Sequence, residues 1–375
     1  MSVQSSLPRR IVFHPLSCAE FGVVRSVLGQ DSRFRLSHIG PLVASLATHI
    51  QRRPYIEKTN AAVAAAPDDW HLQSPPVFVV GFWRSGTTLL HEMMAADKSF
   101  VSPRLMDILF PSDAPYLQGH KRKALGAIAQ VKTDEAGAPI YPTRQVDLVE
   151  VSLHRPQEEE LALCHLAAPS FFRASFFPRH RDAHIEEALF SAPDSAARAS
   201  WRAAHMQFAK TLVAKYPQQR ILLKNPANSA RVDDLMAMYP KALFVRIDRE
   251  REAVLKSFQR MMDLSIAQFS LQGSAEPFSR AEAEALYERV IAKLDADWAA
   301  VPEERKTQLT YDTLTADPVD AVRRIYKTLK LPRSKDTALR QRRRWENRVR
   351  HWSPKPATDL SAVSEARDEA RALTP

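Results

Sequence analysis

Short apolar runs alternate along the chain with longer segments of helical periodicity. Residues 77–80 (Val-Phe-Val-Val) form a continuous β-prone run, which is typical of a parallel strand buried on both faces. Two further apolar runs predict strands at 221–223 and 242–247, and residues 308–311 (Gln-Leu-Thr-Tyr) are a further candidate strand. The segments that follow these runs have helical spacing and predict helices at 87–96, 229–239, 252–262 and 318–329. The last of these begins after Asp317, a good N-cap, with Pro318 at the first helical position.

This alternation predicts an α/β fold, because a strand, a helix and a second parallel strand form a right-handed crossover unit. The expected organisation has a helical N-terminal segment at 1–70 and an α/β domain at 71–355. Residues of about 120–215 are mostly helical and loop-like, and are expected to form a cap over the site. The final segment, 356–375, is expected to be a C-terminal tail.

The composition is that of a globular protein and excludes the disordered, collagenous and disulfide-rich classes. The 375 residues are 45% hydrophobic and 26% charged. Two cysteines, Cys18 and Cys164, are too few for a disulfide framework and lack metal-ligand spacing, so a reducing compartment is expected. Because the chain has neither a signal-peptide run nor an apolar run long enough to span a membrane, the expected location is cytoplasmic.

Positive charge is concentrated near the C-terminus. The net charge is +10, and residues 330–355 hold ten Lys and Arg against Asp336 and Glu346, a net charge of +8. Such a block suits a polyanion: a nucleic acid, an anionic lipid or a multiply charged cofactor. A solvated helical face is the alternative interpretation.

Residues 81–88 (Gly-Phe-Trp-Arg-Ser-Gly-Thr-Thr) connect a predicted strand to a predicted helix and have the glycine spacing of a P-loop, G-x-x-x-x-G-K-[ST]. Thr88 stands at the hydroxyl position, but Thr87 replaces the lysine that grips a triphosphate, and Arg84 is the only cation in the loop. The pattern favours a ligand with one phosphate and one further anionic group, bound by Arg84, Ser85, Thr87 and Thr88. The alternative is a tight turn with incidental hydroxyl residues.

Residues 84–90 resemble the 5′-phosphosulfate loop of sulfotransferases, P-[KR]-S-G-T-T-[WL], with Trp83 in place of the proline. A second match is Arg249 at a predicted strand end with Ser257 eight residues later. In that family such a pair binds the 3′-phosphate of the cofactor, and arginine gives phosphate a forked, charge-assisted grip. The chain departs from the family pattern immediately after Arg249, where Glu250 and Arg251 replace an Asp-Pro or Asn-Pro pair.

Three further segments resemble the large bacterial type of sulfotransferase. They are 223–228 (Leu-Lys-Asn-Pro-Ala-Asn), the acidic segment 155–160, and 310–318, whose Tyr311 corresponds to a tyrosine at the adenine. The resemblance covers about residues 75–350 and implies a P-loop-like three-layer fold with a central parallel sheet, flanking helices, and helical N-terminal and cap segments. It implies transfer of the sulfuryl group of 3′-phosphoadenosine 5′-phosphosulfate (PAPS) to a hydroxyl or amine of a small molecule, glycan or lipid. The expected nucleotide product is adenosine 3′,5′-bisphosphate (PAP).

Sulfuryl transfer requires cations near the leaving 5′-phosphate, and Arg84 and Lys224 are the candidates. The alternative for Lys224 is an exposed lysine at a strand end. Protein cations make a metal unnecessary in this scheme, and none is expected.

A general base must accept the proton of the acceptor hydroxyl. The competing candidates are Asp107, His154, Glu158 and Glu159, with Glu158 favoured by its match to the acidic segment of the family. A solvated helix start is the alternative for these consecutive glutamates. His91 is expected to be a packing or surface residue.

Two other classes of function compete with a sulfotransferase. A P-loop kinase or NTPase is disfavoured by Thr87 and by the lack of an obvious metal-binding acid after a strand. A non-enzymatic nucleic-acid binder would use the C-terminal arginines, and its affinity would collapse with salt. A specific nucleic acid is not an expected partner of the enzyme, whereas an anionic membrane surface is a candidate partner of the basic block.

Overall fold

The computed structural model describes residues 15–29, 39–116, 132–133, 139–140, 155–166, 168–272 and 276–351. Its centre is a parallel five-stranded sheet in the order β2-β5-β1-β6-β7. The strands are β1 (Val77–Val80), β2 (Phe100–Val101), β5 (Arg220–Lys224), β6 (Leu243–Asp248) and β7 (Lys306–Thr310). A separate antiparallel pair comprises β3 (Lys132–Thr133) and β4 (Pro139–Ile140).

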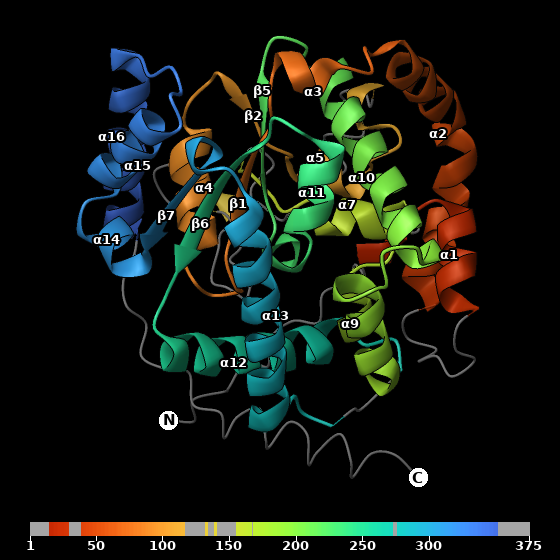
Figure 1. The fold of residues 1–375 in the computed structure, drawn as a ribbon. Helices are drawn as coiled ribbons and strands as arrows, with labels where there is room; N and C mark the ends of the chain where they lie inside the picture. Colours follow the sequence, from red (N-terminus) through yellow and green to blue (C-terminus); the bar gives the residue numbers. More distant parts are fainter. Residues whose placement is uncertain are drawn as a thin grey trace.

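Helices cover both faces of the sheet and make it the middle of three layers (Figure 1). Val77 and Val79 of β1 face the layer of α4 (Thr87–Ala95), α15 (Pro318–Thr328) and α16 (Lys335–His351). Phe78 and Val80 point to the other layer, which contains α10 (Ala196–Lys215) and α11 (Val232–Met238). The alternation follows from the twofold period of a strand, and it explains why both kinds of position in β1 are apolar.

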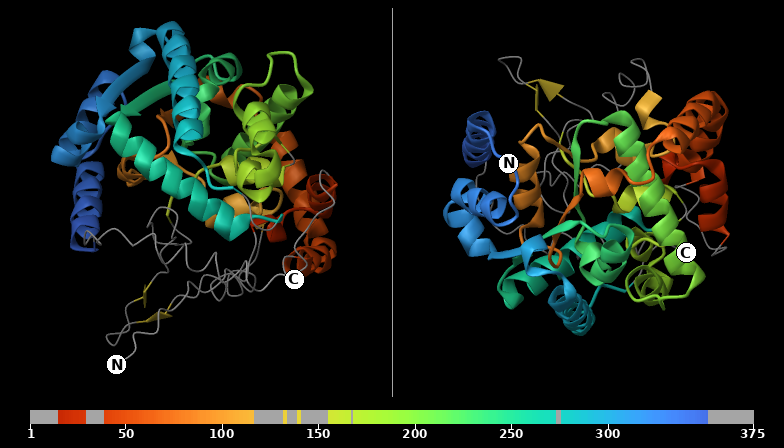
Figure 2. Two further views of the ribbon diagram at one scale, coloured as in Figure 1. Left: turned by 90° about the horizontal axis from the view of Figure 1, so that it is seen from below. Right: turned by 45° about the horizontal axis from the view of Figure 1, so that its top comes forward.

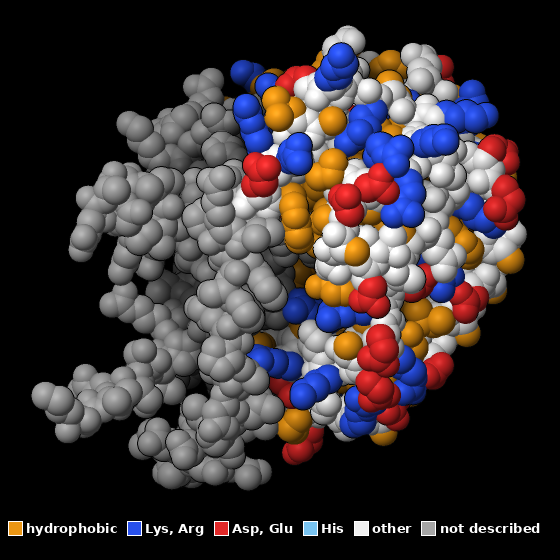
Figure 3. Space-filling model, turned by 90° about the vertical axis from the view of Figure 1, so that its left-hand side faces the viewer, with side chains coloured by type: hydrophobic (Ala, Val, Ile, Leu, Met, Phe, Trp, Pro, Cys, Tyr) orange, Lys and Arg blue, Asp and Glu red, His pale blue; other side chains and the backbone are white. Residues whose placement is uncertain are grey.

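The remaining helices extend these layers. Helices α12 and α13 pack against each other, while α1 and α2 lie on the side of the molecule opposite α16 (Figure 2). Figure 3 looks onto the α15–α16 side. The other α-helices are α1 (Phe21–Leu28), α2 (Ile39–Ala65), α3 (Trp70–Gln73), α5 (Leu105–Leu109), α7 (Glu160–His165), α8 (Phe172–Phe176), α9 (Arg181–Leu189), α12 (Arg251–Phe269), α13 (Arg280–Ala300) and α14 (Tyr311–Ala316). Short 3₁₀ helices are η1 (Pro15–Cys18), η3 (Ala114–Tyr116), η4 (Pro178–His180), η5 (Pro226–Ala230) and η6 (Glu303–Arg305).

The predicted α/β architecture is confirmed, and each of the four predicted strands is present within two residues of its expected bounds. Helix α15 has the predicted start, because the Asp317 carboxylate accepts the backbone N–H of Asp320 at 2.9 Å. The two-residue strand β2 was not predicted, because so short a run carries no periodicity. Of the expected cap, residues 132–133, 139–140, 155–166 and 168–215 are described. The first two form the strands β3 and β4, which were not predicted, and the others are largely helical. The expected tail at 356–375 lies outside the described residues.

Three element boundaries differ clearly from the prediction. Helix α12 continues to Phe269, beyond the expected end at Met262. Tyr311 was expected to end a strand but begins α14, because Thr310 accepts the backbone N–H of Thr313 at 3.2 Å and caps a helix there. The expected helix at 229–239 is interrupted at Arg231, between η5 and α11. The side chain of Asn225 caps η5 by accepting the N–H of Ala227 at 3.0 Å, so the chain enters a tight 3₁₀ turn before the α-helix begins.

The N-terminal helices are tied to the α/β core by a buried ion pair. Arg52 of α2 donates to both carboxylate oxygens of Asp113, at 2.8 and 2.6 Å, and both side chains are almost fully inaccessible. The guanidinium also lies 4.7 Å from the ring centre of Phe110. Because a buried carboxylate is costly without its partner, this pair couples the position of α2 to the fold of the segment after α5.

We expect Arg52→Ala to lower the free energy of unfolding by about 3–5 kcal/mol, since it removes a buried guanidinium that donates to both oxygens of the buried Asp113 carboxylate. Arg53→Ala is the matched control. Arg53 forms an exposed pair with Glu57 on the same helix, and exposed pairs contribute little. Urea unfolding of the full chain measures both variants. Equal, small effects would show that α2 is not coupled to the core through Asp113.

Candidate donor site and base segment

Two glycines allow the loop between β1 and α4 to lie close to the ends of β6 and β7. Gly81 has φ +147°, and a Cβ there would be 2.3 Å from the carbonyl oxygen of Ile247. Gly86 has φ +100°, and a Cβ there would be 2.5 Å from the ring of Tyr311. The loop is further fixed by the Gly81 N–H, which donates to Ser229 Oγ at 2.9 Å. Both positions therefore require glycine.

Residues from three separated segments meet beside this loop. Arg84 Nε donates to Ser257 Oγ at 2.8 Å, and Arg249 Nη1 donates to the carbonyl oxygen of Arg84 at 3.0 Å. The Arg249 guanidinium lies 4.1 Å from the ring centre of Tyr311, whose edge packs against Gly86. Five residues that the sequence singled out for cofactor binding thus form one cluster.

The N-terminus of α4 completes a cradle for an anion. Gly86 is the N-cap residue and provides no side-chain cap for the first N–H groups of the helix. Ser85 Oγ is buried and has no hydrogen-bond partner among the described residues. Uncapped helix N–H groups and an unpaired hydroxyl next to Arg84 fit a phosphate or sulfate group.

Lys224 connects this helix to the acidic segment. It ends β5, directly beside Val79 of β1, and its side chain is only 3% exposed. Its Nζ donates to Thr88 Oγ1 at 3.1 Å and forms an ion pair with Glu158. The alternative interpretation of Lys224 as an exposed lysine at a strand end is wrong, since the side chain is buried between Thr88 and a carboxylate.

Glu160 anchors the acidic segment through buried contacts. It pairs with Arg231 at 2.9 Å and accepts from Asn225 Nδ2 and the backbone N–H of Phe171, each at 2.6 Å. Burial alone would favour the neutral acid, but Arg231 and these donors hold the pKa of Glu160 below its ordinary value.

Glu159 is buried beside it and has a different electrostatic environment. Its Oε1 accepts from Asn228 Nδ2 at 2.7 Å, whereas Oε2 has no partner among the described residues. Burial raises the pKa of Glu159 to about 7. The interpretation of the three glutamates as a solvated helix start is therefore wrong for Glu159 and Glu160, while the side chain of Glu158 is 31% exposed.

A second buried carboxylate, Glu92, lies one helical turn beyond Thr88 on α4. It pairs with Arg155 at 3.0 Å and with Arg344 of α16 at 3.5 Å. It therefore joins the start of the acidic segment and the C-terminal basic helix to the helix that follows the glycine loop. Sequence reasoning assigned no role to Glu92, because its partners are far away along the chain.

Two other candidates for the base have separate surroundings. Asp107 pairs with Lys215 at the end of α10 and accepts the backbone N–H of Arg104 at 2.9 Å, as an early residue of α5. His154 lies outside the described residues. His91 is buried and contacts Ser102 Oγ through Nε2 at 2.9 Å, and burial, helped by the charge of Lys224, lowers its pKa well below the ordinary value.

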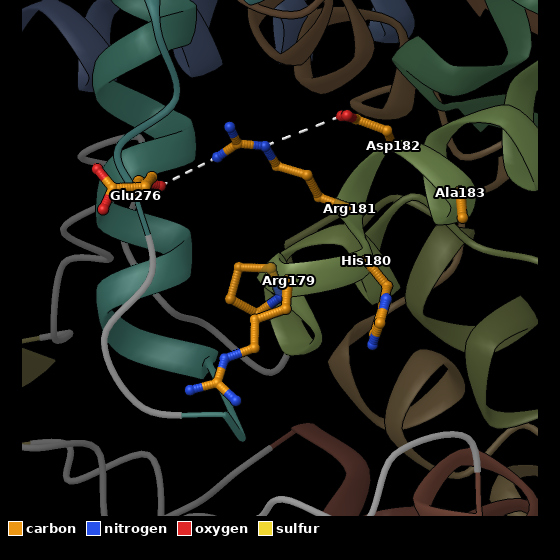
Figure 4. A pocket seen from close by; sticks show the side chains of 7 residues that line it. Arg179, His180, Arg181, Asp182, Ala183 and Glu276 are labelled. Atoms are coloured by element: carbon orange, nitrogen blue, oxygen red, sulfur yellow. Dashed lines mark hydrogen bonds and ion pairs between the residues drawn. The ribbon is translucent and has the colours of Figure 1, made fainter.

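A separate pocket of about 610 Å³ lies between η4, the start of α9 and Glu276 (Figure 4). Arg181 crosses this pocket and donates to the carbonyl oxygen of Glu276 at 3.0 Å. None of the predicted site residues lines it.

Among the described residues, no group of three or more His, Cys, Asp or Glu side chains has the arrangement of a metal site. No helix in the described part is long and apolar enough to cross a bilayer.

Comparison with known proteins agrees with the geometry of the loop. The model of the Sulfotransferase family matches residues 75–336, which contain every described residue of the cluster. The chain belongs to the sulfotransferase family. Relatives of this chain include the omega-hydroxy-beta-dihydromenaquinone-9 sulfotransferases Stf3 of Mycobacterium bovis and Mycobacterium tuberculosis. Each is 27% identical over an alignment of 270 residues that covers 69% of this chain and 64% of the relative.

Solved structures support the fold of this chain. Sulfotransferase STF9 from Mycobacterium avium has a TM-score of 0.62 at 18% identity, covering 92% of this chain and 85% of the other. Sulfotransferase STF1 from Mycobacterium tuberculosis H37Rv has a TM-score of 0.58 at 19% identity, covering 86% and 84%. The predicted P-loop-like three-layer fold is thereby confirmed.

The buried Glu159 predicts a pH dependence of the stability of this protein. Its pKa rises on folding from an ordinary value of 4.5 to about 7, so unfolding releases a proton between these values. The free energy of unfolding that Glu159 contributes is therefore fully present below its ordinary pKa of 4.5. It falls by up to about 3 kcal/mol as the pH rises from there through 7. Glu159→Gln keeps a neutral side chain in both states and escapes this loss.

Urea unfolding from about pH 5 to pH 8 measures the difference between the variant and the natural protein. We expect Glu159→Gln to gain relative stability as the pH rises. Parallel stability curves across this range would contradict a raised pKa of Glu159.

Proposed function

We propose that this protein transfers the sulfuryl group of PAPS to the hydroxyl group of a lipid-type acceptor. The observation that carries the proposal is the meeting of Arg84, Arg249, Ser257 and Tyr311 beside the uncapped start of α4. The loop between β1 and α4 provides Arg84, and the end of β6 provides Arg249, so the site contains two cationic side chains. A donor with a phosphosulfate and a separate 3′-phosphate matches two anion-binding positions.

In this proposal the 5′-phosphosulfate is bound by the N–H groups at the start of α4 and by Arg84, Ser85, Gly86, Thr87 and Thr88. Arg249 and Ser257 bind the 3′-phosphate. Tyr311 presents its ring to the adenine, held in place by its contact with Gly86 and Arg249. These residues provide hydroxyl, backbone N–H and guanidinium groups, all of which donate hydrogen bonds to phosphate and sulfate oxygens.

The reacting centre is proposed to lie next to Lys224. The acceptor hydroxyl gives its proton to the Glu158 carboxylate as its oxygen bonds to sulfur, and the bond from sulfur to the 5′-phosphate oxygen breaks. Lys224 and Arg84 stabilise the charge that grows on the departing phosphate. Lys224 suits this role because it contacts Thr88 on one side and Glu158 on the other.

The acceptor class follows from the relatives. The Stf3 proteins are named for omega-hydroxy-beta-dihydromenaquinone-9, a lipid-type alcohol, as their substrate. The chain matches 64% of their length. We therefore propose a lipid-type alcohol as acceptor, rather than a glycan or a small polar molecule. The kinase and nucleic-acid-binding alternatives are disfavoured because Thr87 replaces the P-loop lysine and the family match spans the loop.

The donor site predicts PAP binding in the presence of EDTA, because protein cations supply the charge. At a PAP concentration about 100 times Kd, thermal unfolding should show a stabilisation of about 2.7 kcal/mol. Arg249→Ala should weaken PAP binding by roughly 1.5–3 kcal/mol and leave adenosine 5′-phosphosulfate, which lacks the 3′-phosphate, nearly unaffected. Calorimetric titration measures both ligands.

Arg251→Ala is the matched control, because Arg251 begins α12 nearby and pairs with Glu288 at 2.9 Å. It should leave both affinities unchanged. Equal losses for both ligands in Arg249→Ala would assign Arg249 a structural role. Stabilisation by ATP and Mg²⁺ with none by PAP would overturn the sulfotransferase proposal.

For the base, Glu158→Gln should lower kcat by about 10²–10⁴-fold with little change in PAP affinity, since the amide cannot accept the proton. Asp107→Asn is the comparison and should do much less, because Asp107 pairs with Lys215. The assay follows transfer of label from radiolabelled PAPS to a hydroxylated dihydromenaquinone. If Asp107→Asn is the inactive variant, or Glu158→Gln keeps near-normal turnover, the base is not Glu158.

A further inference from the structure

Helices α15 and α16 pack together and present an exposed cationic face, which we call the basic face. Figure 3 looks onto this side of the molecule, where Lys and Arg side chains are frequent in the upper part. The exposed cations of the basic face are Arg323, Arg324, Lys327, Lys330, Lys335, Arg342 and Arg343. The carboxylates on these two helices are Asp336 and Glu346 of α16 and Asp317 and Asp320 at the start of α15. The basic face therefore has a clear excess of positive charge.

Many of these cations lack a carboxylate partner, unlike those on another surface of the protein. Arg323 and Arg324 pair with Asp320, and Arg342 approaches Glu346 at 3.7 Å. Within the described part of the chain, no ion pair involves the other four, Lys327, Lys330, Lys335 and Arg343. On the surface formed by α12 and α13, by contrast, Arg251, Arg280 and Arg289 each pair with glutamates. Unpaired cations gathered on one face produce a positive potential that extends into the solvent and attracts a polyanion.

The periodicity of α16 also places an apolar side chain within the basic face. Thr337 and Gln341 are buried on the inner side, while Lys335, Leu339 and Arg342 lie on the outer side at helical spacing. Leu339 is 47% exposed and is one of few large exposed apolar residues in the described chain. A helix face that combines Lys, Arg and an exposed leucine is typical of contact with a lipid headgroup region.

The basic face borders the proposed active site. Arg344, on the inner side of α16, pairs with Glu92 of α4, and Glu92 also pairs with Arg155. Helix α4 carries Thr88, which contacts Lys224 and, through it, Glu158. One layer of side chains therefore separates the outer cations from the segment that holds the proposed base.

We propose that the basic face docks on the surface of an anionic membrane and brings the active site to an acceptor that resides in the bilayer. Each exposed Lys or Arg gains from anionic headgroups within a Debye length, and Leu339 enters the headgroup boundary. A nucleic acid would also bind these cations, but it offers no apolar region for Leu339 to enter. The membrane is therefore the favoured partner. The purpose of this docking rests on the proposed lipid-type acceptor, but the docking itself is measured without donor or acceptor.

The test is sedimentation of the full chain with vesicles of phosphatidylcholine, with and without phosphatidylglycerol. We expect binding to the anionic vesicles alone, and release as salt is added. Lys327→Gln/Arg343→Gln should weaken binding by about 30-fold, from two cations at ~1 kcal/mol each. Leu339→Ser should also weaken vesicle binding, while leaving the binding of a duplex DNA probe unchanged.

The matched control is Arg53→Gln/Lys58→Gln, which removes the same charge from α2 on the opposite side of the molecule. It should bind anionic vesicles like the natural protein. Three outcomes would each overturn the docking proposal. They are an equal loss of vesicle binding in the control variant, no binding of the natural protein to anionic vesicles, and preferred binding to the DNA probe together with no effect of Leu339→Ser on vesicle binding. The PAP-induced thermal shift checks that every variant is folded, and its absence in the natural protein would count against the sulfotransferase proposal and not against docking.

Discussion

The close approach of the glycine loop to the ends of β6 and β7 is the constraint on which the proposed donor site depends. Any side chain at Gly81 would collide with the backbone of Ile247, and any side chain at Gly86 would collide with the ring of Tyr311. Because neither position carries a side chain, Arg84 can donate a hydrogen bond to Ser257 while Arg249 donates one to the backbone of the same loop. The same approach leaves the first N–H groups of α4 without a side-chain cap and available to an anion.

Two neighbouring carboxylates, Glu159 and Glu160, are buried beneath the site, and their surroundings shift the two pKa values in opposite directions. Arg231, Asn225 and a backbone N–H favour the ionised form of Glu160, whereas Glu159 has one amide donor and a pKa of about 7. Two adjacent buried charges would repel in a medium of low dielectric constant, and a proton on one of them relieves this. The network fixes the turn from which Glu158 extends to Lys224.

Glu92 has a corresponding function one turn further along α4. Its two arginine partners come from positions 155 and 344, so one carboxylate connects the acidic segment to the C-terminal basic helix. This arrangement gives α16 two distinct faces. The inner face contributes the charge of Arg344 to the buried structure, and the outer face carries Lys335 and Arg343, which have no carboxylate partner among the described residues. The concentration of charge near the C-terminus thus serves two different physical roles.

The sequence by itself determined the strands, the glycine loop and the family resemblance. Apolar runs, glycine spacing and the Arg249–Ser257 interval are local patterns, and local patterns record backbone conformation directly. The tertiary structure alone decided which charges are buried. Three consecutive glutamates are equivalent in the sequence, yet contacts with residues 225, 228 and 231 bury two of them and leave Glu158 at Lys224. Burial and pairing depend on partners more than sixty residues away, and no pattern along the chain encodes that distance.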